Sequence, residues 1–228
     1  MIAAFFSASF AFGQDQNGTK MPTWQDEIAN GLLSYHQLTV DDFPIDDHAH
    51  PNAGFWVKAF IDPHYHCYLK PAYGGVVYAY IDQWVVFSGF SRKESSRESA
   101  MHDMKGALPY AQALLDINEI YARQLAAVQP GDLPSGRGSS RAAAQTDLAI
   151  RVRVFCGKIY EQVQTERGAL ATATANGQNK KKLGELAVTI KKRLDALPSP
   201  APSPVPTSSI PLAPIRSPPP PGGPAVPR

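Results

Sequence analysis

The order in which strand-like and helix-like segments follow one another constrains the fold of this chain more than any other feature. Between residues 54 and 90 the sequence is rich in aromatic and β-branched side chains, and turn signals interrupt it at Asp62-Pro63, Pro71 and Gly74-Gly75. This pattern predicts four strands in an antiparallel meander, at residues 55–61, 65–70, 76–81 and 84–87. The second half of the chain has helical periodicity. Strands followed by helices predict an α+β domain.

Three segments of the second half are predicted to be helices. The first begins near Pro109, since proline suits a first helical turn, and it has one apolar face. Its apolar positions are Tyr110, Leu114, Ile117, Tyr121 and Leu125, and its polar positions are Gln112, Asp116, Glu119 and Arg123. A loop rich in Gly, Pro and Ser, at residues 129–140, leads to a second helix at 142–166, and a third follows at 180–197. We expect the four polar side chains at the surface of the first helix.

The two ends of the chain differ from the part between them. Residues 1–13 contain no charged side chain and are rich in Ala, Phe and Ser, which is typical of a secretory signal peptide. An ordinary buried first helix is the alternative, because the basic residues that usually begin a signal peptide are missing. From Pro198 onwards 13 of the 31 residues are proline. This composition predicts a disordered, polyproline-like tail at residues 198–228, which acts as a tether or as a ligand for a polyproline-binding domain.

The amino-acid composition bears on three questions: whether the chain binds nucleic acid, whether it spans a membrane and whether its cysteines pair. Hydrophobic residues make up 43% of the 228 residues and charged residues 18%, as in a soluble globular domain, which we place at residues 14–197. The net charge of +2 and the lack of a basic stripe with interleaved aromatics give no reason to expect nucleic acid. No apolar run reaches the ~20 residues of a membrane span. Cys67 and Cys156 either form a disulfide in an oxidising compartment or remain free thiols.

Four segments in the same order carry a resemblance to a known family. The first predicted helix reads ALPYAQALLDINEIYARQL at residues 107–125, and the other segments are LTVDDF at 38–43, FSRKESS at 90–96 and LATATANGQN at 170–179. Together they resemble a family of secreted bacterial proteins of unknown function that are predicted zinc-dependent peptidases, whose helix runs approximately LLAHEQGHFDIAELYARKL. The resemblance covers residues 38–194. It implies a zincin-like α+β fold and a zinc site of the HExxH type.

The same resemblance implies that the zinc site has been lost. In an HExxH helix two histidines four residues apart hold Zn²⁺, and the glutamate between them acts as the general base. The corresponding positions here are Tyr110, Ala111 and Leu114, and those of the downstream motif are Ala171, Ala173 and Asn176. None of these residues supplies a thiolate, an imidazole or a carboxylate. The resemblance therefore predicts a non-catalytic pseudo-peptidase without a cofactor.

Four histidines offer a different place for a metal. His48 and His50 precede the predicted strands, while His64 and His66 lie two residues apart, on one face of a strand. If the four imidazoles converge, they suit Zn²⁺, Cu²⁺ or Ni²⁺. The alternative is that they are solvent-exposed histidines that share no site.

These observations predict an exported protein, periplasmic or extracellular, that binds an envelope protein or a peptide rather than catalysing a reaction. An exposed strand edge can accept an extended peptide. The candidate binding residues are Gln112, Asp116, Glu119 and Arg123, for which ordinary surface charge is the alternative. The alternative function is a metal-binding protein or a residual metallohydrolase that uses the four histidines.

Overall fold

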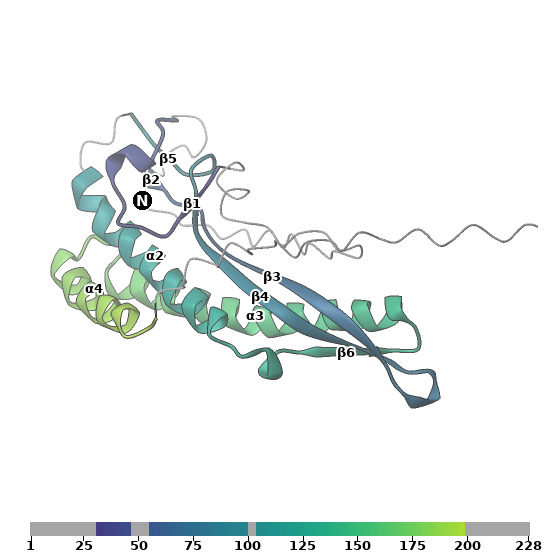
Figure 1. Cartoon of the computed structure of the whole chain (residues 1–228). Helices are drawn as coiled ribbons and strands as arrows, with labels where there is room; N and C mark the ends of the chain where they lie inside the picture. The colour runs from purple at the N-terminus through teal and green to yellow at the C-terminus, as the bar shows by residue number, and fades with distance from the viewer. Residues whose placement is uncertain (1–30, 47–54, 100–103, 199–228) are drawn as a thin grey trace, which may run out of the picture.

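The computed structural model describes residues 31–46, 55–99 and 104–198 of the chain (Figure 1). Within these residues a four-stranded antiparallel sheet packs against two α-helices, and a third α-helix packs on those two. The prediction of an α+β domain is therefore confirmed. The predicted signal segment at residues 1–13 lies outside the described residues, as does the predicted tail apart from Pro198.

A long hairpin dominates the sheet. Its strands β3 (Ala59–Pro71) and β4 (Val77–Ser91) pair along their whole length, and the turn contains Gly74, whose φ of 77° favours glycine. On the other side of β4, β1 (Leu32–Ser34) pairs with one end and β6 (Ser135–Gly138) with the other. Figure 1 shows the hairpin running along one helix, with its turn at the far end from the remaining two helices.

The predicted meander of four short strands is wrong, because the predicted turn at Asp62 and Pro63 lies inside β3. Proline is tolerated there since β3 is the edge strand of the described sheet, where a missing N–H leaves no central ladder broken. A second predicted break, near Asp82, is a β-bulge. His66 pairs with Gln83 and Cys67 with Ile81, so Asp82 is an extra residue on β4 at which the register shifts by one.

The three predicted helices are confirmed with altered ends. They are α2 (Met104–Ala126), α3 (Arg141–Ala173) and α4 (Lys180–Asp195). The hydroxyl of Ser140 caps α3 by accepting a hydrogen bond from the backbone N–H of Ala143, at 3.1 Å. Pro109 lies within α2 rather than in its first turn, and α3 continues to Ala173 instead of ending at residue 166.

Helix α2 contacts the sheet as well as α3 and α4, while α3 also packs along β4 and β6 (Figure 1). Every residue from 110 to 120 is buried, so α2 is not a surface helix with one apolar face. Its Ile117 and Ile120 belong to a core cluster that includes Ile81 of β4 and Leu148 of α3. Burial of each such side chain stabilises the fold by about 1.5–3 kcal/mol. A separate pair of short strands, β2 (Phe55–Trp56) and β5 (Ser96–Arg97), lies near one end of α2.

Strand β6 lies in the stretch for which the sequence predicts only a loop. Its glycines let the backbone pack directly on α3, because a Cβ on Gly136 would lie 2.2 Å from the carbonyl oxygen of Ala144. A Cβ on Gly138 would lie 2.5 Å from the backbone nitrogen of the same residue. Strand β6 thereby fastens the distal half of the hairpin to the first turns of α3.

The two cysteines are free thiols, which decides between the two alternatives left open by the sequence. Cys156 is fully buried on α3, and its burial raises the pKa of the thiol to about 12. None of the helices in the described part of the chain is long and apolar enough to span a membrane.

Candidate functional site

The three positions of α2 that the resemblance aligns with the HExxH motif are core positions. Tyr110, Ala111 and Leu114 are at most 3% exposed. Gly177, in the turn between α3 and α4, lies directly against the first of them, because a Cβ on Gly177 would be 2.8 Å from the Cβ of Tyr110. The structure thus places the two helical motif segments side by side, with a tyrosine side chain filling the space between them.

The three positions of the downstream motif lie at the end of α3 and in the turn that follows. Ala171 is half-buried, while Ala173 and Asn176 are exposed. Asn176 has a left-handed φ of 54°, a conformation that asparagine tolerates better than most residues. The hydroxyl of Thr174 accepts a hydrogen bond from the N–H of Gly177 at 3.0 Å. These residues form a tight turn and provide no strong metal ligand.

A buried cation lies beside the same region. Arg167 of α3 is 5% exposed and interacts electrostatically with Tyr110. Burial lowers the pKa of the Arg167 guanidinium to about 10, so the group remains charged at neutral pH. A fixed positive charge in a poorly solvated environment opposes the binding of a divalent cation.

Two polar residues of α2 bind the segment that follows β1. They are buried, whereas the sequence predicts them at the surface. Gln112 is 8% exposed and Asp116 is 5% exposed. The side-chain carbonyl of Gln112 accepts a hydrogen bond from the N–H of Leu38 at 2.6 Å, and its amide donates to Asp116 at 2.7 Å. The hydroxyl of Tyr35 donates to the same carboxylate at 2.8 Å. Burial, followed by the hydrogen bond to Asp116, raises the pKa of Tyr35.

The other two polar residues connect α2 with β4 and α4. Glu119 is 2% exposed and accepts hydrogen bonds from the hydroxyl of Ser88 and from Nε of Arg123, the latter at 2.8 Å. The same guanidinium donates to the carbonyl oxygen of Leu197 at 3.3 Å, where the chain leaves α4. The interpretation of these residues as ordinary surface charge is therefore wrong, because their polar atoms tie the elements of the fold together.

His64 and His66 point to the same face of β3, yet each has a different carboxylate as its neighbour. Nε2 of the nearly buried His64 lies 3.1 Å from the carboxylate of Asp62 without the geometry of a hydrogen bond. Nδ1 of the more exposed His66 lies 2.7 Å from the carboxylate of Asp82. Among the described residues no group of three or more His, Cys, Asp or Glu is arranged to hold a metal. The other two histidines of the predicted cluster lie outside those residues, so the four-histidine site stays a prediction.

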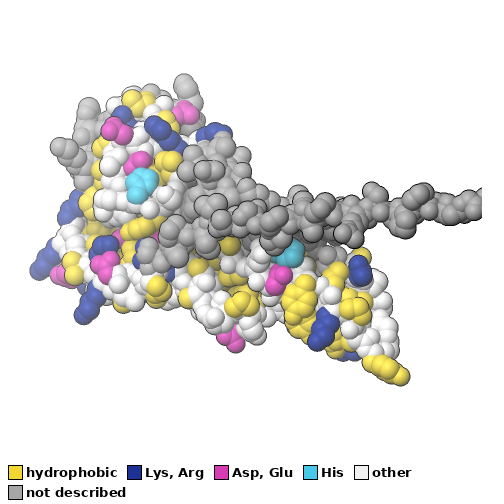
Figure 2. Space-filling view, in the orientation of Figure 1, with side chains coloured by type: hydrophobic (Ala, Val, Ile, Leu, Met, Phe, Trp, Pro, Cys, Tyr) yellow, Lys and Arg dark blue, Asp and Glu magenta, His cyan; other side chains and the backbone are white. Residues whose placement is uncertain are grey.

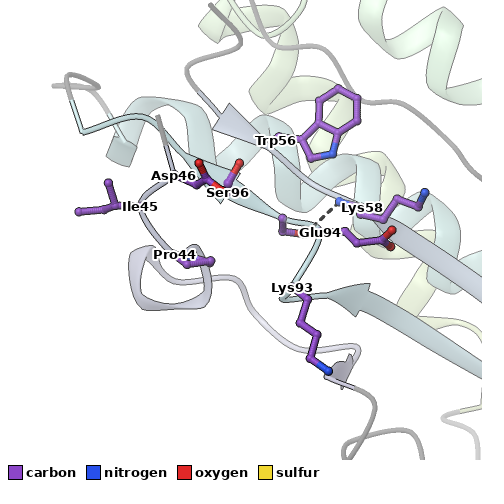
Figure 3. A pocket seen from close by; sticks show the side chains of 9 residues that line it. Pro44, Ile45, Asp46, Trp56, Lys58, Lys93, Glu94 and Ser96 are labelled. Carbon is purple, nitrogen blue, oxygen red and sulfur yellow. Dashed lines mark hydrogen bonds between the residues drawn. The ribbon is translucent and has the colours of Figure 1, made fainter. Parts of the chain in front are cut away.

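A pocket of about 310 Å³ lies beside β2 and β5. In Figure 3 its side chains come from three segments and point in different directions. The backbone N–H of Lys58 donates to the hydroxyl of Ser95 at 3.0 Å, and the lining mixes basic, acidic and apolar groups that do not converge on a common point. The lining residues are Pro44, Ile45, Asp46, Trp56, Lys58, Lys93, Glu94, Ser95 and Ser96.

The distal half of the hairpin has a row of stacked tyrosines. Tyr68 and Tyr80 are opposite each other on β3 and β4, and their ring centroids are 5.5 Å apart. The ring of Tyr78 lies 6.0 Å from that of Tyr80, and the guanidinium of Arg137 on β6 lies 5.9 Å from the centre of the Tyr78 ring. Lys70 is paired with Tyr78 across the strands. We name these five residues the tyrosine ladder.

The tyrosine ladder lies on the face of the sheet opposite the core. The pair Tyr68–Tyr80 alternates along the hairpin with the pair Leu69–Ala79, and Ala79 is fully buried. Tyr68 is 47% exposed, and Tyr73 at the turn is completely exposed. Figure 2 shows hydrophobic side chains with interspersed Lys and Arg over this part of the hairpin. A contiguous apolar surface of this kind is typical of an interaction site.

Every polar group of the tyrosine ladder can donate a hydrogen bond. The phenol hydroxyls can also accept one, whereas the ammonium and the guanidinium only donate. Within the described residues no hydrogen bond or ion pair engages the hydroxyls of its tyrosines, the ammonium of Lys70 or the guanidinium of Arg137. The surface is therefore suited to a ligand that combines apolar rings with hydrogen-bond acceptors.

The tyrosine ladder is missing from the sequence-based expectations, although its signal is present. Tyr68 and Lys70 are two residues apart, as are Tyr78 and Tyr80, and the two pairs flank the Gly74-Gly75 turn. A hairpin closed at that turn places both pairs on one face. The prediction of short separate strands concealed this relation.

No protein-family model, no curated protein and no solved structure matches this chain. The resemblance to the zinc-peptidase family stays a prediction. The function is therefore inferred from the geometry of the described residues.

Proposed function

We propose that this chain is an exported, non-catalytic binding module, which holds a protein or peptide of the cell envelope on its tyrosine ladder. The observation that supports this proposal is the position of the ladder. Stacked rings lie on a projecting hairpin, on the face turned away from the core, with donors at their edges. Tyrosine and arginine are enriched among the residues that dominate binding energy at protein interfaces.

The non-catalytic part of the proposal is supported by the state of the peptidase-like positions. Tyr110 and Leu114 fill the core where the resemblance requires histidines, and Arg167 places a positive charge beside them. A zinc peptidase needs anionic or imidazole ligands and an open coordination position for water. We propose that the peptidase-like scaffold has been kept for its shape. Export is proposed from the composition of residues 1–13.

Strand β3 supports peptide binding in a second way. In the described sheet it pairs with β4 alone, so its outer edge has no strand partner. An extended peptide can pair with such an edge. However, Pro63 interrupts it, because proline has no N–H to donate, as is common in edge strands that avoid aggregation. We therefore propose that the ladder provides the main contact and that the edge of β3 assists.

The test is a selection of random displayed peptides on the full chain, followed by measurement of their dissociation constants by fluorescence anisotropy. The double variant Tyr68→Ser/Tyr80→Ser is expected to weaken the selected peptides by at least ~10-fold. Loss of two aromatic contacts at the centre of a small interface exceeds the ~1.4 kcal/mol that corresponds to that factor.

The matched control is Val188→Ser on α4, which also removes an exposed apolar side chain (71% exposed) but is remote from the hairpin. It is expected to leave the affinities unchanged. Selection of no peptide, or of peptides that bind the double variant equally well, would overturn the binding proposal. Zinc-dependent cleavage of casein by the purified chain would overturn the non-catalytic part.

A further inference from the structure

The chain contains a segment whose chemistry matches the tyrosine ladder. We infer that the proline-rich segment at residues 198–228 docks on the ladder of the same molecule as a polyproline II helix. This inference rests on the proposed binding function and names the class of ligand that the ladder recognises, a proline-rich segment.

The hydrogen-bonding capacities of the two surfaces are complementary. A polyproline II helix has no internal hydrogen bonds, and proline has no N–H, so its backbone presents carbonyl acceptors almost exclusively. The ladder presents donors: three phenol hydroxyls with Lys70 and Arg137 at their side. Aromatic-lined surfaces are the usual receptors for such helices, because proline rings pack on tyrosine faces.

The shape of the ligand also fits. The ring centroids of Tyr68 and Tyr78 lie 5.5 Å and 6.0 Å from that of Tyr80, the first across the strands and the second along β4. A polyproline II helix has three residues per turn, so the four consecutive prolines at residues 218–221 place a pyrrolidine ring on every side of such a helix. At least one proline ring therefore faces the ladder in any rotation about the helix axis.

The length of the chain is sufficient to reach the ladder. The segment begins beside α4, where Arg193 is paired with Glu166 of α3. The ladder lies over β6, which packs on Ala144 and Leu148 near the start of the same helix. From Glu166 back to Leu148 the helix covers roughly 30 Å. The 20 residues from Pro198 to the proline run span ~25 Å as a flexible coil and ~60 Å when extended, so the required distance lies within their range.

The charge of this segment predicts a salt dependence of binding that differs from that of an acidic ligand. Residues 198–228 contain no Asp or Glu and two arginines, so they form no ion pair with Lys70 or Arg137. Docking of this segment therefore depends on ring packing and hydrogen bonds and is weakly sensitive to salt. An acidic partner would instead lose affinity steeply as the ionic strength rises.

The experiment measures binding of a fluorescent peptide that contains residues 210–224 to two forms of the full chain. One is the natural sequence, and in the other the four prolines at 218–221 are changed to serine. An internal segment competes at an effective concentration of ~1 mM, so an intrinsic dissociation constant below ~100 μM gives an apparent affinity at least ~10-fold weaker for the natural chain. Adding Tyr68→Ser/Tyr80→Ser to the serine variant is expected to weaken the peptide by at least ~10-fold.

Each outcome has a defined meaning. Equal affinity of the peptide for the two chains overturns docking within one molecule. A natural chain that dimerises in sedimentation equilibrium, while the serine variant remains monomeric, also overturns it and assigns the ladder to a second copy. If the peptide binds neither chain while selected library peptides still bind the ladder, this inference fails and the proposed function stands. A dissociation constant that rises more than about threefold between 50 and 500 mM salt contradicts the ring-packing mode.

Discussion

The region around α2 and the distal half of the hairpin differ in which side chains are buried and which are exposed. On α2 the side chains of Gln112, Asp116 and Glu119 are buried and hydrogen-bonded, as with Glu119 at 2% exposure. On the distal hairpin the large aromatic side chains are exposed, as with Tyr68 at 47%. Buried polar groups are expensive unless every partner is present, and exposed aromatic groups add little to folding. The difference indicates that α2 holds the fold together and that the hairpin is free to serve binding.

The largest effect is expected where a buried charge loses its partner. Glu119→Ala removes the carboxylate that accepts from Arg123 and Ser88, and it leaves the guanidinium of Arg123 in a mostly buried position. Breaking such a pair costs about 3–5 kcal/mol of the free energy of unfolding, which urea denaturation measures. The control is Glu185→Ala, whose partner Lys182 is exposed, and it is expected to cost less than about 0.5 kcal/mol. A similar small cost for both variants would remove the distinction between the two ends of the molecule.

The next effect concerns the attachment of the hairpin to α3. Gly136→Ala places a Cβ 2.2 Å from the carbonyl oxygen of Ala144, so that β6 and α3 must separate. We expect a loss of about 2–3 kcal/mol in the free energy of unfolding, as for overpacking of a core. Gly131→Ala is the matched control, because nothing lies within 4 Å of its Cβ position. Equal stability of the two variants would mean that the distal hairpin is not fastened through β6.

The sequence predicts the elements of this fold better than their connections. All three α-helices are predicted from the sequence, and Ser140 and Asn179 cap the starts of α3 and α4. The long hairpin is not predicted, because Asp62-Pro63 has the composition of a turn and only pairing with β4 keeps it extended. Strand β6 is hidden for a related reason, since its glycines are required by close packing on α3 and not by local propensity.

The candidate site likewise depends on contacts between distant parts of the chain, which the sequence does not predict. Local periodicity places the polar residues of α2 on a solvent face, but the N-terminal strand region and α4 cover that face. Burial of Asp116 and Glu119 therefore depends on contacts with residues far along the chain. The tyrosine ladder depends on the register of β3 with β4, which the sequence determines only once the turn at Gly74 is recognised.

A smaller and pH-dependent effect is expected at the buried network. Tyr35→Phe removes the hydrogen bond to Asp116 and is expected to cost about 1–2 kcal/mol at pH 7. Since burial raises the pKa of Tyr35 above its usual value of 10.0, folding favours the protonated phenol. The stability from this group is complete below pH ~10 and is lost as the pH rises further, because the unfolded state then releases the proton first.

The measurement for this variant is urea denaturation at pH 7, 9 and 11. The natural chain is expected to lose more stability between pH 9 and pH 11 than Tyr35→Phe does. Parallel pH profiles would show that Tyr35 is not held in its protonated form by the fold.

The smallest effect on stability is expected at the tyrosine ladder. A variant there tests most directly whether the exposed rings of the hairpin are dispensable for folding. Tyr68→Ser removes a half-exposed ring and one stacked pair, so we expect a loss of no more than about 1 kcal/mol. Ile81 lies beside Tyr80 in the sequence but on the core face, at 5% exposure, and Ile81→Ala is expected to cost about 2–5 kcal/mol. If Tyr68→Ser costs as much as Ile81→Ala, the ladder is required for folding. Weaker peptide binding by the Tyr68→Ser/Tyr80→Ser variant would then reflect unfolding and would not support the binding function.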